Sequence, residues 1–295
     1  MDQDLESLEG KEPPFTSHQS VWLTSTMDVI RSFSYRQNVF FLCMGIAFML
    51  INAAFFRFAS ILDRQKPAEK SPRPKTSSKH PTHLLVVLGS GGHTAEMLNI
   101  LQQTPLLQVE YTHRTYVVSS GDSFSASKAV EFEKELLEQL ERESIQGSNK
   151  EYDIVTVRRA RRVHQGIMTA PFSTLACLFD CFKVLRGTHP QLRIKHGQYP
   201  DLILTNGPGT GVCVVLASII LLFFGLASPH SKNAKDMSYH SSGQMRTIYI
   251  ESWARVESLS LSGKILKPFV DRFIVQWPQL VKKGDRVEYI GPLVT

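Results

Sequence analysis

Two hydrophobic patterns alternate along the chain from residue 83 onward. Short apolar runs predict strands, over residues 84–88, 115–120, 153–157, 201–206, 247–252 and 273–277. Longer apolar-rich stretches between them predict helices, over residues 94–102, 125–143, 167–186 and 212–227. Apolar strands that alternate with helices are typical of a parallel sheet with helices on both faces. We therefore predict an α/β fold, a Rossmann-like doubly wound parallel sheet.

One uncharged stretch nearer the start of the chain follows neither pattern. Of the residues from Val39 to Phe56, only Asn52 is clearly polar. A helix of this length can just span a hydrocarbon core of ~30 Å. The stretch begins too late for a cleavable signal peptide, and a buried core helix fits poorly because the stretch lies outside any domain. We predict a transmembrane helix over residues 39–58.

The charges beside this helix predict its orientation. Seven Lys and Arg residues lie between residues 57 and 79, whereas only Arg31 and Arg36 lie at a similar distance upstream. Because Lys and Arg are enriched on the cytosolic side of membrane helices, we expect residues 1–38 to form a polar lumenal tail. Residues 59–82 are rich in Pro, Ser, Lys and Arg, which predicts a basic tether that can also contact anionic lipid. Residues 83–295 are then the cytosolic domain.

Composition excludes several classes of protein. The chain has 295 residues, of which 42% are hydrophobic and 20% charged, so it is not wholly disordered. Its net charge of +6 is mild and does not require nucleic acid, which we do not expect as a partner. The four cysteines are too few and too scattered for a disulfide scaffold or a zinc site, so we expect no bound metal. Cys177 and Cys181 share a helical face, which favours core packing.

Two glycine-rich turns each follow a predicted strand and precede a predicted helix. The first comprises Gly89, Ser90, Gly91, Gly92 and His93, and the second includes Asn206, Gly207, Gly209 and Thr210. Glycine lets the backbone approach a ligand closely, and a helix N-terminus offers free N–H groups to phosphate. Two such turns on parallel strands indicate one shared anionic ligand, a diphosphate. Each turn alone also fits a simple tight connection between strand and helix.

The two best-known nucleotide motifs are missing from these turns. No Gly-Lys-Ser/Thr follows either turn, which excludes a P-loop. A dinucleotide-binding fold places an acidic residue at the end of its second strand, whereas this strand ends in Ser119 and Ser120, and Asp122 lies further on in a turn. We therefore expect neither NAD nor another cofactor.

Four sequence motifs resemble one known family. They are VVLGSGGHTAEML, YVVSSGDSFSASKAVEFE, TNGPGTG and IYIESWARVESLSLSGKIL. In this order they resemble the membrane-anchoring subunits of the UDP-N-acetylglucosamine transferase of asparagine-linked glycosylation, over roughly residues 83–294. The N-terminal domain of the bacterial lipid-linked peptidoglycan transferase is similar, but more distantly.

The resemblance implies half of a split GT-B glycosyltransferase. In that family this subunit binds the acceptor, dolichyl-diphosphate-N-acetylglucosamine, and a separate catalytic partner binds UDP-N-acetylglucosamine. The pair adds the second N-acetylglucosamine at the cytosolic face of the endoplasmic reticulum and contiguous nuclear membrane, and we expect the chain alone to be inactive. Its cytosolic part is about one domain in length, where a complete GT-B enzyme needs two. A pure recruitment scaffold without a catalytic group and a self-sufficient lipid-linked sugar transferase are the alternatives.

The resemblance and the predicted strand ends together suggest the residues of the site. His93 is a candidate general base for the acceptor hydroxyl, because an imidazole titrates near neutral pH; it could equally contact phosphate or cap the helix. Glu251 is the competing base or orients the sugar, unless it caps a following helix, a role that Ser252 fills equally well. Arg255 either pairs with Glu251 at i+4 or reaches the diphosphate.

Two polar segments carry weaker predictions. A basic run follows the third strand and fits either a solvated surface or contact with lipid phosphate; it comprises Arg158, Arg159, Arg161, Arg162 and His164. The segment from Ser120 to Ser123 either contacts the acceptor or caps the next helix, and capping is favoured.

Overall fold

The computed structural model describes residues 17–63, 82–104, 107, 111, 113–142, 151–161, 165–166, 168–193, 199–207, 209–225, 245–282 and 284–293, with backbone only for residues 17–34. The chain divides into two units, Met1–Arg57 and Phe58–Thr295. Each unit is described by itself below.

Helix α1 contains the predicted membrane span. It runs from Ser17 to Asp63, and its 28-residue segment Tyr35–Leu62 is long and apolar enough to cross a membrane. The helix is longer than the predicted span at both ends. Residues 59–63, which the sequence assigned to the start of the tether, are helical, and Ile61 among them is buried. Residues 64–81 lie outside the described part, so the remaining tether stays a prediction.

The second unit is built on a seven-stranded parallel sheet, which confirms the predicted fold class. The strand order is β3-β2-β1-β4-β5-β6-β7. The strands are β1 (His83–Val87), β2 (His113–Ser119), β3 (Glu151–Val157), β4 (Leu202–Thr205), β5 (Arg246–Ile250), β6 (Arg272–Val275) and β7 (Val287–Tyr289). The first six match the six predicted strands, and β7 is a further edge strand, paired with β6.

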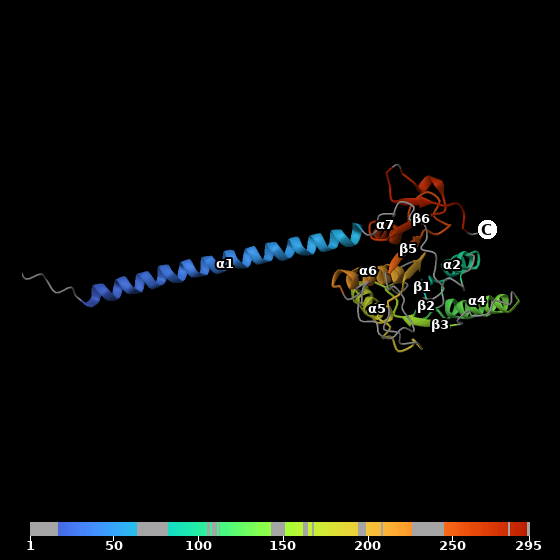
Figure 1. Ribbon diagram of the computed structural model, residues 1–295, viewed down its shortest axis with the longest axis horizontal. Coiled ribbons are helices and arrows are strands. Elements are labelled where there is room, and N and C mark those ends of the chain that lie inside the picture. Colours follow the sequence, from blue (N-terminus) through green and yellow to red (C-terminus); the bar gives the residue numbers. More distant parts are fainter. Residues whose placement is uncertain are drawn as a thin grey trace, which may run out of the picture. The chain divides into compact units, whose positions relative to one another are not determined.

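Helices cover both faces of this sheet (Figure 1). They are α2 (Gly92–Gln102), α4 (Ser123–Arg142), α5 (Ala170–Leu185), α6 (Gly209–Phe223) and the short α7 (Leu261–Leu266), followed by a 3-10 turn, η1 (Pro278–Leu280). Alternate residues of β1 show the two layers. Leu85 packs in one core with residues of α5 and α6, whereas Leu84 packs in another with residues of α2 and α4. A strand that is apolar on both faces produces this doubly covered arrangement.

Most of helix α6 is buried within the second unit. Nine of its fifteen residues are buried, among them Cys213, and it corresponds to the helix predicted over residues 212–227. Cys177 and Cys181 are buried in the same core. The hydrogen bond from Cys181 and burial raise the pKa of the Cys177 thiol, so it remains protonated and serves packing.

A charged network lies buried between β2 and α4. Arg114 donates to both oxygens of the Glu133 carboxylate, at 2.6 and 2.8 Å, and the Tyr116 hydroxyl donates to Glu133 Oε1 at 2.6 Å. The side chains of Arg114 and Glu133 are each 3% exposed. Burial, and after it the Glu133 charge, raises the pKa of Tyr116 well above its ordinary value, so the phenol remains a donor. The network fixes α4 on the sheet.

The strand order reverses between β1 and β4. The chain moves outward from β1 to β2 and β3, then returns to place β4 on the other side of β1. In open α/β sheets, ligands bind beyond the carboxyl ends of the strands at such a switch point. The turns after β1 and β4 are the two glycine-rich turns, so the topology brings them together there.

Candidate functional site

The two glycine-rich turns touch through their backbones. A Cβ atom added to Gly207 would lie 3.3 Å from Gly89 Cα, which is tighter than most real contacts. The Asn206 amide donates to the His93 carbonyl oxygen at 2.7 Å and joins the second turn to the first. The two turns therefore lie together at one place, as binding of a shared ligand would require. What ligand they bind remains a prediction.

The first turn presents open backbone at the start of α2. Gly91 adopts φ +62°, which favours glycine, and no atom lies within 4 Å of where a Cβ of Gly91 or Gly92 would be. The earliest backbone bonds of α2 run from Thr94 and Ala95 to the Gly91 carbonyl. The N–H groups before them belong to the first turn of a helix, whose donors lack intrahelical partners. This is the arrangement that suits an anion.

Hydrogen bonds from hydroxyl groups hold the first glycine-rich turn in place. The Thr94 hydroxyl donates to the Gly89 carbonyl oxygen, and Ser125 Oγ lies 2.7 Å from Thr94 Oγ1. Asp122 accepts hydrogen bonds from both the Ser125 backbone N–H, at 3.1 Å, and the Ser125 hydroxyl, at 2.7 Å. Asp122 thus caps α4, as the capping interpretation predicted, and the α4 cap is coupled to the glycine turn.

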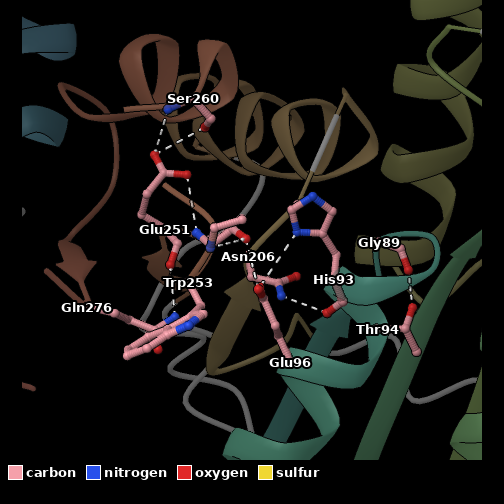
Figure 2. Close-up of polar contacts among 12 residues, drawn as sticks. Gly89, His93, Thr94, Glu96, Asn206, Glu251, Trp253, Ser260 and Gln276 are labelled. Carbon is pink, nitrogen blue, oxygen red and sulfur yellow. Dashed lines mark hydrogen bonds and ion pairs between the residues drawn. The ribbon is translucent and has the colours of Figure 1, made fainter. Parts of the chain in front are cut away.

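The His93 ring faces a carboxylate. His93 Nδ1 lies 3.8 Å from Glu96 Oε2, and the two side chains are 37% and 16% exposed (Figure 2). Both atoms are buried and have no hydrogen-bond partner among the described residues. The other oxygen, Glu96 Oε1, accepts from the Ser252 hydroxyl at 2.8 Å. The sequence-based prediction included His93 but not Glu96; their i,i+3 spacing on one helix was the available signal.

Asn206 contributes an unused acceptor. It is 1% exposed, and because its bond to a carbonyl oxygen requires the NH₂ group, the free atom is Oδ1. Asn206 Oδ1 is buried, and no residue that the structure describes forms a hydrogen bond with it. A carbonyl oxygen repels phosphate oxygens and attracts hydroxyl or amide hydrogens. Asn206 therefore suits a sugar better than the diphosphate expected from the sequence.

Glu251 is buried and fully bonded. Its Oε2 accepts from the Ser260 backbone N–H at 3.0 Å and from the Ser260 hydroxyl at 3.1 Å, and its Oε1 accepts from the Ser252 N–H at 3.2 Å. The next helix, α7, begins only at Leu261, with Ser260 as its N-cap. Glu251 therefore holds the loop after β5 to the start of α7. These contacts favour a positioning role over that of a base.

Gln276 was not identified from the sequence. It lies at the end of β6 and is 2% exposed. Its Nε2 donates to the Glu251 carbonyl oxygen at 3.1 Å, and its Oε1 accepts from the Leu293 N–H at 3.0 Å. Gln276 thus ties the loop after β5 to the segment after β7, and Figure 2 shows its side chain beside Glu251.

The remaining predicted site residues differ in their contacts. The Thr210 hydroxyl lies 2.7 Å from Ser119 Oγ, so it joins the start of α6 to the end of β2. A Cβ on Gly209 would lie 3.0 Å from the Ala160 Cβ, which explains glycine there.

Arg255 is exposed and lies in a turn with its N–H bonded to the Ser252 carbonyl. No ion pair joins Arg255 to Glu251 although both are described, because the segment between them is not helical.

The basic run after β3 is partly committed to the protein itself. The Arg158 guanidinium binds both oxygens of Asp180 at 2.7 and 2.8 Å, and this hydrogen bonding lowers the pKa of Asp180. Arg161 donates to the Gln165 carbonyl oxygen at 3.4 Å. Arg162 and His164 lie outside the described residues. Arg158 is thus structural, and contact of the others with lipid remains a prediction.

Comparison with known proteins identifies relatives of the whole α/β domain. Residues 84–293 match the sequence profile of a family described as "Oligosaccharide biosynthesis protein Alg14 like". The chain is 48% identical over 227 residues to the UDP-N-acetylglucosamine transferase subunit alg14 of Aspergillus fumigatus, covering 67% of this chain and 100% of the relative. The subunits of Schizosaccharomyces pombe and Mus musculus are 42% and 35% identical, covering 74% and 72% of this chain and 87% and 82% of theirs. No solved structure matches significantly.

Proposed function

The chain belongs to the family of Alg14-like oligosaccharide biosynthesis proteins, and from that premise we propose that it is the acceptor-binding, membrane-anchoring subunit of a UDP-N-acetylglucosamine transferase. A separate catalytic subunit binds UDP-N-acetylglucosamine. The acceptor is dolichyl-diphosphate-N-acetylglucosamine, to which the pair adds the second N-acetylglucosamine. The relatives are named as subunits of such a transferase, which supports a partner-dependent activity.

One observation supports acceptor binding by this chain. The turns after β1 and β4 meet at the switch point of the sheet, where doubly wound folds bind ligands. The start of α2 offers backbone N–H groups to the diphosphate, and Asn206 Oδ1 and the His93 ring lie beside it for the sugar. Gly89 to Gly92 then bind phosphate, together with Gly207 and Gly209. Arg255, exposed in its turn, is a further cation for the diphosphate.

His93 is the proposed general base. Its ring is partly exposed at the site, and the imidazole can take the proton of the acceptor hydroxyl as that oxygen attacks the donor sugar. Glu251 is the weaker candidate, since its carboxylate already accepts three hydrogen bonds. No metal or cofactor enters this proposal.

Helix α1 supports the membrane part of the proposal. Its segment Tyr35–Leu62 is apolar, mostly exposed and long enough to span a bilayer. The excess of Lys and Arg after it supports a cytosolic position for the α/β domain, on the side of the membrane where nucleotide sugars are found. We place the protein in the endoplasmic reticulum membrane and the contiguous nuclear membrane, as a single-pass protein.

A transfer assay with three arms tests the proposed function. Full-length chain in detergent, the donor-binding partner, and their mixture are each incubated with radiolabelled UDP-N-acetylglucosamine and a dolichyl-diphosphate-N-acetylglucosamine acceptor. We expect transfer only in the mixture, and recovery of the partner with the tagged chain. Transfer by the chain alone would indicate a self-sufficient enzyme. Transfer by the partner alone at the rate of the mixture would leave the chain only a recruiting role.

A further inference from the structure

The contacts around His93 point to a residue that acts through it. We infer that Glu96 is a positioning residue that orients the His93 ring and selects the tautomer in which Nε2 is free to accept a proton. This inference rests on the proposed function, in which His93 is the base. Ser252, from the loop after β5, in turn holds Glu96.

The two unpartnered atoms face each other. His93 Nδ1 and Glu96 Oε2 are both buried, neither has a hydrogen-bond partner in the described part of the chain, and they are 3.8 Å apart. A buried polar atom without a partner loses its hydrogen bonds to water without replacement, so leaving both unsatisfied is unfavourable. An approach of roughly 1 Å between the side chains brings them to hydrogen-bonding distance and satisfies both atoms at once.

This hydrogen bond fixes the tautomer. A neutral imidazole carries one N–H, and the other nitrogen bears the lone pair. With the hydrogen on Nδ1, the ring donates to Glu96 and Nε2 is the free base. With the hydrogen on Nε2, the Nδ1 lone pair would face a carboxylate oxygen, and the two acceptors would repel. The same division between an orienting acid and a base is found in hydrolase triads.

Both members of the pair are held from outside α2. The Ser252 hydroxyl donates to Glu96 Oε1 at 2.8 Å, which leaves Oε2 for the ring. The Asn206 amide donates to the His93 carbonyl oxygen at 2.7 Å and fixes the backbone from which the ring projects. Residues following β4 and β5 therefore position a pair on the helix after β1. A helix-stabilising role alone would require neither contact.

Glu96 is also poorly placed for the simplest structural role. The N-cap of α2 is Gly91, and a carboxylate that caps a helix by hydrogen bonding to the N-cap N–H sits at the third helical position. Glu96 lies two positions further on, and its bonded oxygen faces Ser252 rather than the backbone. Its interaction with the helix dipole falls off within the first turn.

A double-mutant cycle on the assembled complex tests the inference. We compare kcat for the wild type, Glu96→Ala, His93→Ala and the double variant, each with the donor-binding partner and the dolichyl-diphosphate acceptor. We expect Glu96→Ala to lower kcat by about 10- to 100-fold with little change in the KM for the acceptor. In the His93→Ala background the same replacement should have almost no effect, because Glu96 acts only through the ring.

Two further variants keep the test independent of folding. Ser252→Ala leaves the charge of Glu96 intact and should lower kcat several-fold, again only when His93 is present. Glu138→Ala removes an exposed carboxylate from α4 and should leave kcat unchanged. An equal loss from Glu96→Ala in both backgrounds, or none in either, would overturn the inference. Failure of the proposed function is distinguishable, because the wild-type complex would then transfer no sugar.

Discussion

Replacing His93 by Ala is expected to slow sugar transfer by the assembled complex by about 10²- to 10⁴-fold, the usual contribution of a general base. The ring is partly exposed where the two glycine turns meet, and its Nδ1 faces Glu96. The anchoring contact from Asn206 goes to the His93 backbone oxygen, so Ala preserves it. The loss should therefore appear in kcat and leave the KM for UDP-N-acetylglucosamine unchanged.

The steady-state constants also separate the other roles open to His93. If the ring contacts the acceptor phosphate, His93→Ala raises the KM for the acceptor and His93→Lys restores it. If the ring is only structural, both constants stay near wild type once the complex is intact. Gln103→Ala, which changes an exposed side chain just after α2, is the matched control. A fall in kcat of less than threefold for His93→Ala would contradict its role as base.

Glu251 should behave differently from His93. Its carboxylate holds Ser260 and the loop before α7, and a Cβ on Gly263 would meet its Oε2. Loss of Glu251 therefore disturbs the loop that carries Ser252. If both His93 and Glu251 can be replaced in an intact complex without loss of turnover, the chain is a recruitment scaffold.

Glu133→Ala is expected to lower the free energy of unfolding by about 3–5 kcal/mol, because it leaves the buried Arg114 guanidinium without its counter-ion. Of its described acceptors, Arg114 would keep only the Tyr111 carbonyl oxygen at 2.8 Å, and Tyr116 would lose the Glu133 oxygen to which it donates. Such a loss is a large part of the total stability of a domain. Urea unfolding of the full chain in detergent, followed by tryptophan fluorescence, measures it.

Two further variants separate the effect of removing the buried Glu133 charge from the effect of replacing any carboxylate on α4. Glu138→Ala removes an exposed carboxylate from the same helix, 3.6 Å from Arg142, and should change stability by at most about 0.5 kcal/mol. Arg114→Met combined with Glu133→Leu should recover at least about 1 kcal/mol relative to Glu133→Ala, since neither buried charge of this network then remains. Equal effects of Glu133→Ala and Glu138→Ala would show that the network contributes no net stability.

The regular elements of the fold were predictable from hydrophobic pattern. Strands such as residues 84–88 are apolar on both faces, and helix α6 carries no charged residue. The sequence of each element alone therefore predicts that it is buried. The ends of the elements differ from the predicted ends because capping residues determine where a helix begins and stops. Thus α2 begins at Gly92 rather than Thr94, since Gly91 provides the positive φ that starts it. Strand β7 was missed because three residues are too few to show a period.

The site was only partly predictable. The two glycine-rich turns could be recognised from their composition. That they lie near each other could be predicted because the carboxyl ends of parallel strands meet at one edge of the sheet. The contacts of the acidic residues depend on pairs far apart in sequence, such as Ser252 and Glu96, which no local pattern specifies. For the same reason Arg158 appeared as part of a free basic run, although Asp180 on α5 neutralises it.

Separate binding of the two substrates is the most direct test of the division of labour proposed for this chain. Full-length chain in nanodiscs without its partner is titrated with dolichyl-diphosphate-N-acetylglucosamine and, separately, with UDP-N-acetylglucosamine, with protein-free nanodiscs as the blank. We expect saturable binding of the lipid acceptor and none of the nucleotide sugar. Saturable binding of UDP-N-acetylglucosamine to the chain alone, or acceptor binding no greater than in the blank, would contradict the acceptor-binding role.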